Sequence, residues 1–304
     1  MVQDFSFEAD TIRLPKGAVA RAHRHTLRSG GRVLLALTQG PFRPYIYPLY
    51  TPSGQQVLEE SPADHPHHNG VWVGSDHVHC RFPLDGGRHE DGTYCFYVNE
   101  TFQGRARGRI ESTAVAGAAL DDGGFEIRLS AQWRGPCEWG APEGRVLATE
   151  ERTVAVHSGG DAHVIDLASE LRPTEWELGL GPTRHAYFGI RAAESMRVTA
   201  GGRLSDAAGA ADQEAISAGS AAWVDYSGPL AAGAEAGIAI LAGAGFEPPG
   251  WFATDWGVVQ LNPFARAERR LAPGNSWRAT ARLVVHDGPV EPAKLTALQA
   301  AMED

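Results

Sequence analysis

Phe125-Glu126-Ile127-Arg128-Leu129-Ser130-Ala131-Gln132-Trp133 places an apolar residue at each odd position and a polar residue at each even one. Successive side chains of a β-strand point to opposite faces, so this alternation predicts a strand with one buried and one solvated face. The stretch Arg109 to Val115 precedes it across the turn-forming residues Asp121 to Gly124. The two stretches are therefore expected to form an antiparallel pair.

The same pattern recurs along the chain. Thr149 to His157 and Ala162 to Leu171 flank Ser158-Gly159-Gly160-Asp161, a composition typical of a tight hairpin turn. Further strands are expected at Arg32 to Thr38, Tyr45 to Tyr50, Gly237 to Leu241, Gly257 to Leu261 and Ser276 to His286.

Only the C-terminus has a helical pattern. Leu295, Leu298 and Met302 have helical spacing within Glu291 to Met302, and Pro292 is tolerated in a first turn. The stretch Ala207 to Ala222, rich in Ala, Gly and Ser, is expected to form a surface excursion.

These elements predict an all-β fold, a large antiparallel β-sandwich with a short C-terminal helix. The 304 residues could form two domains by length alone, but large sandwiches reach this size as one, and the 36 glycines and 19 prolines suit many turns. With no repeat and no linker, residues 1–304 are expected to form a single β-sandwich domain.

Charge and composition exclude several classes of protein. A net charge of -10 without a run of Lys or Arg argues against nucleic acid as a partner. No window approaches the ~20 apolar residues that span a bilayer, and the first residues have no signal-peptide pattern. The three cysteines, Cys80, Cys95 and Cys137, fit neither a disulfide framework nor a zinc ribbon, so a cytoplasmic location is expected.

The segment Asp64-His65-Pro66-His67-His68-Asn69-Gly70-Val71-Trp72 carries the strongest functional signal. Imidazole titrates near neutrality and is a common metal ligand, so three histidines beside a carboxylate predict a reaction or coordination site. In an extended segment His65 and His67 would point to one side and His68 to the other. Asp64, His65 and His67 are therefore predicted to bind one divalent metal ion, with His68 catalytic and Asn69 and Trp72 contacting substrate.

Two other histidine clusters are weaker signals. Asp76-His77-Val78-His79-Cys80 repeats the alternating spacing, either at the same site or on the surface. Arg184-His185-Ala186-Tyr187-Phe188 puts an arginine and a histidine beside aromatic rings. This second segment suits a catalytic His185 with Arg184 and Tyr187 at the substrate, and Arg43 is a further substrate-binding candidate.

The chain resembles a bacterial family of unassigned function that commonly carries the label "methane oxygenase PmoA". The resemblance rests on Arg43 to Gly54, Asp64 to Trp72 and Trp223 to Gly228, and is extended by Leu261 to Phe264 and Arg282 to Gly288. It covers about residues 43 to 288, and the histidine segment is its specific part. Methane oxidation is rejected, because the enzyme subunit of that name is an integral membrane protein and this sequence has no span.

A fainter resemblance is to the aldose 1-epimerases and other galactose-mutarotase-like sandwiches. His185-Ala186-Tyr187-Phe188 is similar to the segment that holds their general-acid histidine, and Leu271 to Trp277 is similar to their closing Pro-Gly turn. Those enzymes place a glutamate base shortly before that turn. This chain has Gln260-Leu261-Asn262 instead, which argues against simple mutarotation.

Three functions remain open from the sequence. The first is a carbohydrate-active enzyme that acts on a sugar or keto-glycoside by histidine- or metal-assisted proton transfer, through epimerisation, β-elimination or hydrolysis. The second is a non-catalytic sandwich that binds or senses a small-molecule carbohydrate. The third is a cupin-like iron oxygenase that uses Asp64, His65 and His67 as ligands.

Overall fold

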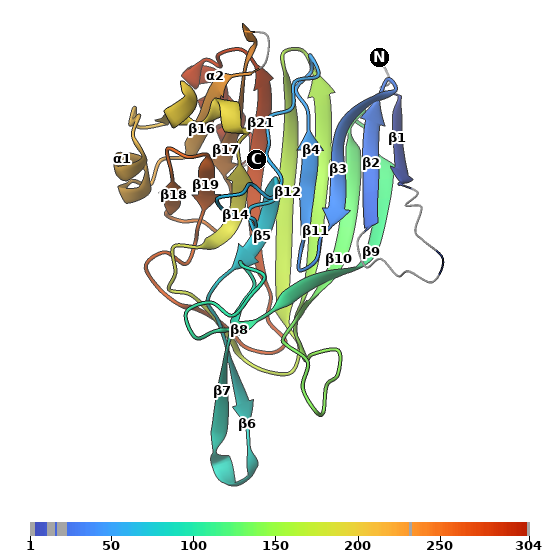
Figure 1. The fold of residues 1–304 in the computed structure, drawn as a ribbon, viewed down its shortest axis with the longest axis vertical. Coiled ribbons are helices and arrows are strands. Elements are labelled where there is room, and N and C mark those ends of the chain that lie inside the picture. The colour runs from blue at the N-terminus through green and yellow to red at the C-terminus, as the bar shows by residue number, and fades with distance from the viewer. Residues whose placement is uncertain (1–3, 11–15, 17–22, 231–232, 303–304) are drawn as a thin grey trace.

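The computed structural model describes residues 4–10, 16, 23–230 and 233–302. Two large antiparallel sheets face each other, with a smaller sheet at one end (Figure 1). The predicted all-β sandwich with a short C-terminal helix is confirmed. No helix among the described residues is long and apolar enough to cross a membrane.

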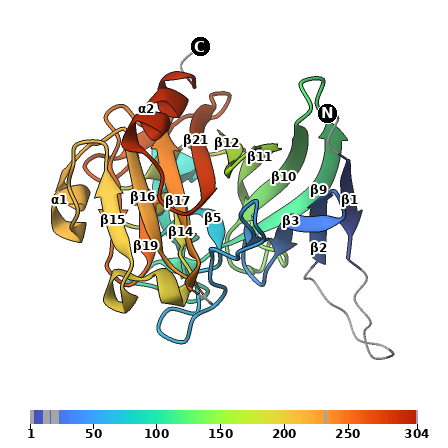
Figure 2. The same cartoon turned by 90° about the horizontal axis from the view of Figure 1, so that it is seen from above.

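Each large sheet has eight strands. The first sheet has the order β1 (Phe5–Ala9), β2 (His23–Ser29), β3 (Arg32–Gln39), β4 (Pro44–Leu49), β5 (Val71–Ser75), β14 (Ala186–Arg191), β19 (Val258–Leu261) and β18 (Trp251–Ala253). The second has the order β15 (Arg203–Asp206), β16 (Trp223–Pro229), β17 (Glu235–Ala242), β21 (Trp277–Asp287), β12 (Ala162–Pro173), β11 (Val146–Gly159), β10 (Phe125–Arg134) and β9 (Arg109–Ala119). Viewed from above, the two sheets form neighbouring layers (Figure 2).

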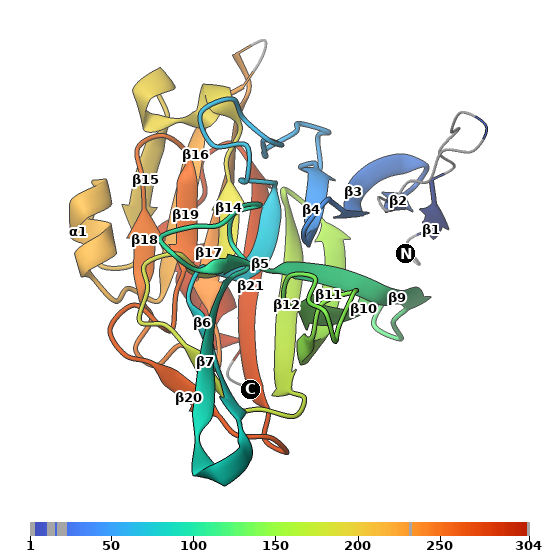
Figure 3. The ribbon, with the colours of Figure 1, turned by 60° about the horizontal axis from the view of Figure 1, so that its bottom comes forward.

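The third sheet has the order β20 (Arg269–Leu271), β13 (Leu178–Leu180), β6 (Val78–Pro83), β7 (His89–Cys95) and β8 (Ala106–Arg107). The β6–β7 hairpin extends away from the sandwich (Figure 3). Three short 3₁₀ segments lie in connections: η1 (Asp85–Gly87), η2 (Glu194–Met196) and η3 (Val198–Ala200).

The alternation in β10 packs as predicted. Ile127 and Leu129 are buried, whereas Arg128 between them is exposed. Strand β10 pairs antiparallel with β9 and with β11, and β11 pairs with β12, so both predicted hairpins are present. The buried faces of the two large sheets contribute to one hydrophobic core that runs from Leu27 to Val285.

Two helices accompany the sheets. Helix α2 (Pro292–Ala300) packs Leu295 against Trp223 and Val284 on the outer face of the second sheet. Helix α1 (Gln213–Ala218) lies inside the stretch Ala207 to Ala222, which was expected to be a surface excursion and has no helical pattern in the sequence. A local cap begins this helix: the Asp212 carboxylate accepts a hydrogen bond of 2.8 Å from the Ala215 amide.

Candidate functional site

A row of paired residues on the first sheet forms the base of the site. Tyr45 pairs with Trp72, Trp72 with Gly189, Gly189 with Gln260, and Gln260 with Phe252. Directly paired residues of neighbouring strands point to the same face, and their chain neighbours point to the other. This row therefore lies on the outer face of five adjacent strands, β4, β5, β14, β19 and β18, while the residues next to it enter the core.

Gly189 gives room to the indole of Trp72. A Cβ atom at residue 189 would lie 2.4 Å from two ring carbons of Trp72, which is closer than side chains can approach. The indole therefore lies flat over β14 and is 1% exposed. Trp72, predicted to contact substrate, is instead buried beneath the histidines.

The histidine segment forms turns and is not extended. The His65 amide donates to the Pro62 carbonyl at 3.1 Å, and the His68 amide donates to the His65 carbonyl at 2.9 Å. Gly70 then brings the chain onto β4, at a φ of 53° and so close that a Cβ would lie 1.9 Å from the Ile46 carbonyl oxygen. Because the backbone turns, all three imidazoles gather together, and the expectation that His68 points away is wrong.

Four rings of this segment and its surroundings lie nearly parallel. His68 lies 5.1 Å from Trp72 and 5.1 Å from His65, and His65 lies 4.3 Å from Trp256, with interplanar angles of at most 12°. His67 stands edge-on to this stack, 4.3 Å from His68. The stack fixes His65 and His68 and leaves His67 at the side of a pocket.

The predicted metal ligands Asp64, His65 and His67 do not form a ligand set. Both oxygens of Asp64 accept hydrogen bonds of 2.9 Å from buried Arg191, and His65 is stacked on Trp256. Within the part of the chain that the structure describes, no group of three His, Cys, Asp or Glu side chains could hold a metal ion. These residues therefore do not fit a metal, and the cupin-like oxygenase loses its basis.

Arginine also sets the charge of Asp64. Burial alone would raise the pKa of this carboxyl, but hydrogen bonds from Arg191 and His65 and the charge of Arg197 lower it to about 2. Asp64 is thus a fixed anion that positions the loop against Arg191, rather than a metal ligand.

Two imidazoles of the site are held neutral. Burial, followed by the positive charge of Arg43, lowers the pKa of His67 to about 3. The pKa of His68 lies still further below its ordinary value, mainly through burial and then through His67 and Arg43. Arg43 itself is fully buried and donates to the backbone carbonyls of Tyr97 and His67.

Tyr97 links the histidine segment to His185. Its ring lies 5.4 Å from His67 and stacks on His185 at 5.1 Å. Its hydroxyl lies 2.8 Å from His68 Nε2 and accepts a hydrogen bond of 2.7 Å from the Gln260 amide. Tyr97 carries no sequence signal, because the run Cys95 to Val98 has the apolar composition of a core strand.

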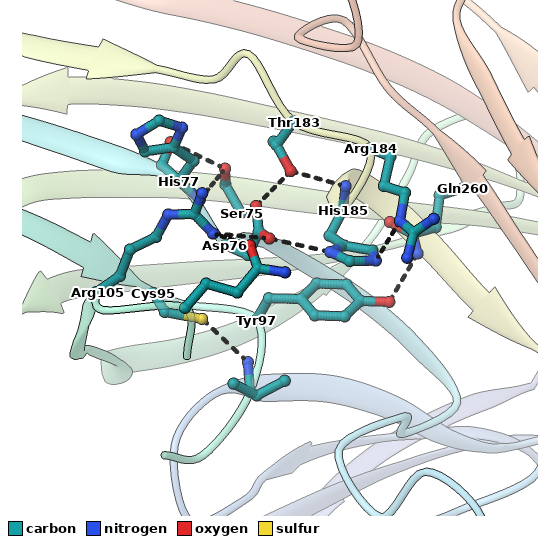
Figure 4. A network of polar contacts seen from close by, with 12 residues as sticks. Ser75, Asp76, His77, Cys95, Tyr97, Arg105, Thr183, Arg184, His185 and Gln260 are labelled. Atoms are coloured by element: carbon teal, nitrogen blue, oxygen red, sulfur yellow. Dashed lines mark hydrogen bonds and ion pairs between the residues drawn. The ribbon is translucent and has the colours of Figure 1, made fainter. Parts of the chain in front are cut away.

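His185 is held by a carboxylate. Its Nδ1 lies 2.9 Å from Asp76 Oδ2, and Asp76 also accepts hydrogen bonds from Thr183 and Arg105 (Figure 4). Burial would raise the pKa of Asp76, but the hydrogen bonds from His185 and Thr183 outweigh it and place the pKa below its ordinary value. On the other side of the imidazole, Arg184 Nε donates to His185 Nε2 at 3.1 Å.

Asp76 belongs to the second histidine cluster of the sequence, but its neighbours do not join the site. His77 Nδ1 lies 3.3 Å from the Pro182 carbonyl, and His79 pairs with Asp91 in the β6–β7 hairpin. The turn between β5 and β6 thus contributes one carboxylate and no imidazole.

Tyr187 lies on the opposite side of β14 from the other candidates. It is fully buried, its ring lies 4.8 Å from Trp277, and its hydroxyl lies 2.9 Å from Ser169 Oγ. Burial raises its pKa well above the ordinary value. Tyr187 is therefore part of the core between the sheets and does not contact a ligand at this site.

A pocket of about 300 Å³ opens beside His67. It is lined by Pro41, Phe42, Tyr45, Ser61, Pro66, His67, Asn69, Val98, Asn99 and Glu100. Asn69, predicted to bind substrate, lies in this lining, and its amide donates to Ser61 Oγ at 2.8 Å.

Several deeply buried polar atoms at the site lack a hydrogen-bond partner among the described residues. They are Arg43 Nε, His68 Nδ1, Asn69 Oδ1, Trp72 Nε1 and Gln260 Oε1, on side chains that are all at most 5% exposed. Buried polar groups are normally satisfied, and exceptions commonly mark functional positions. Their concentration here favours a site for a ligand with many polar groups.

Comparisons with known proteins place the chain in a family without a known activity. The model of a family of unknown function, DUF6807, matches residues 24–300. No curated protein sequence matches the chain.

Three solved structures among those that match have a faint likeness to this chain. A polysaccharide lyase has 11% identity and a TM-score of 0.32, over 94% of this chain and 33% of its own. A protein described as a kojibiose phosphorylase from human microbiome has 7% identity and a TM-score of 0.31, over 75% of this chain and 32% of its own. A TPR-domain containing protein from Parabacteroides distasonis has 9% identity and a TM-score of 0.29, over 96% of this chain and 56% of its own. The chain thus spans about a third of the length of the first two.

Proposed function

We propose that this chain, which belongs to the DUF6807 family of unknown function, is a carbohydrate-active enzyme that removes a proton from a sugar. His185 is the base, Asp76 positions it, and neutral His67 donates a hydrogen bond to the oxygen on which negative charge develops. The observation that carries the proposal is the pairing of His185 with Asp76 beside the ring of Tyr97, which His67 also contacts.

The hydrogen bonds of His185 define its tautomer. An ionised carboxylate only accepts, so Nδ1 carries the proton that faces Asp76. The guanidinium of Arg184 only donates, so Nε2 offers a lone pair. An imidazole with this tautomer and a carboxylate behind it suits a general base, because the carboxylate stabilises the imidazolium that forms.

His67 supports the reaction in a different way. With a pKa of about 3 it stays neutral at physiological pH, so it is a poor proton acceptor but a good hydrogen-bond donor. A neutral imidazole aimed at an oxygen stabilises an enolate-like transition state without giving up a proton. No hydrogen bond of the described chain occupies its ring nitrogens, and the ring lines the pocket.

The sugar class is supported by the surroundings of the base. Phe102 and Phe252, both half-buried, stand edge-on to His185 at 5.9 and 5.8 Å. Sites for small polar ligands combine such apolar walls with a few convergent polar groups. The similarity of the segment from His185 to Phe188 to the aldose 1-epimerases, stated above, points to the same class. Abstraction of a C–H proton next to a carbonyl or carboxyl group would lead to epimerisation or β-elimination.

Asp76→Asn tests the proposal. The amide keeps the shape of the side chain but cannot stabilise an imidazolium, so turnover should fall about 10²- to 10⁴-fold while the sugar still binds. Proton NMR of a panel of neutral, keto and acidic glycosides, incubated with the purified protein, identifies the substrate and measures the rates.

His79→Asn is the matched control, because this histidine also faces a carboxylate but lies in the β6–β7 hairpin. It should turn over substrate at the wild-type rate. Equal loss in both variants, or no loss in Asp76→Asn, would show that the His185 pair is not catalytic.

A sugar-binding protein without catalysis is the second candidate. Gln260 lies in the stretch where the epimerases place a glutamate, and its amide cannot accept a proton. Binding of a sugar that wild-type protein never converts would favour this second function over the enzyme.

A further inference from the structure

We infer that the ligand of this site carries a carboxylate and that Arg184 binds it. The inference rests on the proposed function and names its substrate class: an acidic sugar, such as a uronic acid or its glycoside.

Most arginines around the site already face a carboxylate. The pairs are Arg191 with Asp64, Arg197 with Glu59, and Arg105 with Asp76, at 2.9, 3.0 and 3.3 Å. These pairs leave no local excess of charge.

Arg184 is different. Its contacts within the described chain are the hydrogen bond to His185 Nε2 and the ring of Phe252, which lies 5.6 Å from Cζ, and neither partner is negatively charged. The side chain is exposed, and among the residues that the structure describes no hydrogen bond or ion pair engages its two terminal nitrogens. A guanidinium presents a fixed fork of donors that matches a carboxylate in a bidentate geometry. Arg184 thus offers an unused anion receptor directly beside the base.

A buried cation adds to the positive potential. Arg43 is fully buried, and its partners are two carbonyl oxygens and the aromatic rings of Phe42, Trp72 and Tyr97. A buried charge without a counter-ion is costly, and an anionic ligand nearby would offset that cost. Glu100 in the pocket lining is exposed, so solvent screens its charge. The site is therefore positive within a chain of net charge -10.

Binding of a carboxylate would also prepare the base. A side-on carboxylate takes Nε and one terminal nitrogen of the guanidinium, and a bond to an anion is stronger than one to a neutral imidazole. Arg184 Nε would then leave His185 Nε2, whose lone pair becomes free to accept the proton. Binding of an acidic sugar would thereby free His185 Nε2 to accept the proton of that sugar. A neutral sugar would leave His185 Nε2 bonded to Arg184.

Ligand-observed NMR titrations with matched sugars test this inference. The probes are methyl glucuronoside against methyl glucoside, and methyl galacturonoside against methyl galactoside, which differ only in the carboxylate. Wild-type protein should bind the acidic member of at least one pair about tenfold more tightly or better. Arg184→Gln should abolish that preference, and Arg88→Gln, at an exposed arginine of the β6–β7 hairpin, should keep it.

The outcomes separate this inference from the proposed function. Equal affinity for acidic and neutral sugars, or a preference that survives in Arg184→Gln, overturns the carboxylate receptor and leaves a sugar site in place. Failure of wild-type protein to bind either acidic sugar also overturns the carboxylate receptor, whereas the proposed function falls only if no sugar of the wider panel of glycosides is bound or converted.

Discussion

At the scale of single residues, the site depends on imidazoles that are kept uncharged. Burial and the neighbouring guanidinium of Arg43 lower the pKa values of His67 and His68, and the Tyr97 hydroxyl occupies His68 Nε2. This arrangement lowers the free energy of unfolding in acid, because these histidines bind protons in the unfolded chain but not in the folded one.

Stability should therefore fall as the solution becomes more acidic. The pKa of His67 is about 3 in the folded protein, against an ordinary 6.5. Between these values the unfolded chain holds an extra proton, so the free energy of unfolding decreases as pH falls below about 6.5 and does not change through this group above it. Urea denaturation of wild type and His67→Asn at several pH values measures the effect. In the variant, the slope of unfolding free energy against pH should correspond to about one proton fewer than in wild type. Identical slopes in the two proteins would contradict the lowered pKa of His67.

The close contact between Gly189 and the Trp72 indole leads to a prediction about stability. Gly189→Ala should destabilise the protein by about 1–3 kcal/mol, because the new methyl group displaces the Trp72 indole and the stack above it. At Gly140 a Cβ meets nothing within 4 Å, so Gly140→Ala should stay within about 0.5 kcal/mol of wild type. Chemical denaturation measures both, and equal stability of the two variants would exclude the close packing.

Single residues also show how much of the site could be predicted. The density of imidazoles located His67 and His68, and the Arg-His pair beside aromatic residues located His185; the fold brings all three to the ring and hydroxyl of Tyr97. Asp76 and Tyr97 could not be paired with them, because their partners are distant in sequence and only the order of the strands makes them neighbours. The structure does not support the predicted metal ligand set, because Arg191 on β14 donates hydrogen bonds to both carboxylate oxygens of Asp64.

At the scale of elements, burial explains which strands can be predicted from the sequence. Strands β10 to β12 have a solvated face and alternate clearly, so the sequence predicts them with their turns. Strands β5, β14 and β19 are buried on both faces, because the site covers their outer side. Their alternation is lost, and of the three only β19 was predicted. The strands that carry the site are thus the hardest to predict from the sequence.

Helix α2 offers a test at this scale. Leu295 is 1% exposed against the second sheet, so Leu295→Ala should cost about 2–5 kcal/mol. Leu84 in the β6–β7 hairpin is 44% exposed, and Leu84→Ala should change stability by less than about 0.5 kcal/mol. Thermal and urea denaturation compare them, and a neutral Leu295→Ala would mean that the helix does not pack on the sheet.

At the scale of the whole molecule, the sandwich separates stability from function. The core lies between the two large sheets, and the site lies on the outer face of the first, where loops between β4 and β5 and after β7 meet the ends of β14 and β19. The composition and strand pattern predicted this class of fold, but not which face would carry the site. That choice follows from the register of five strands, which is a property of the assembled sheet.

Deuterium exchange in D₂O tests the central claim most directly, because a base that removes a sugar C–H proton exchanges it with solvent. Proton NMR of each acidic sugar that the protein binds should show one C–H signal disappearing, or a new product forming, with wild-type protein. His185→Gln should slow this change by about a hundredfold or more. Bound acidic sugars that neither exchange nor react with wild type, or that exchange equally with His185→Gln, would contradict the account.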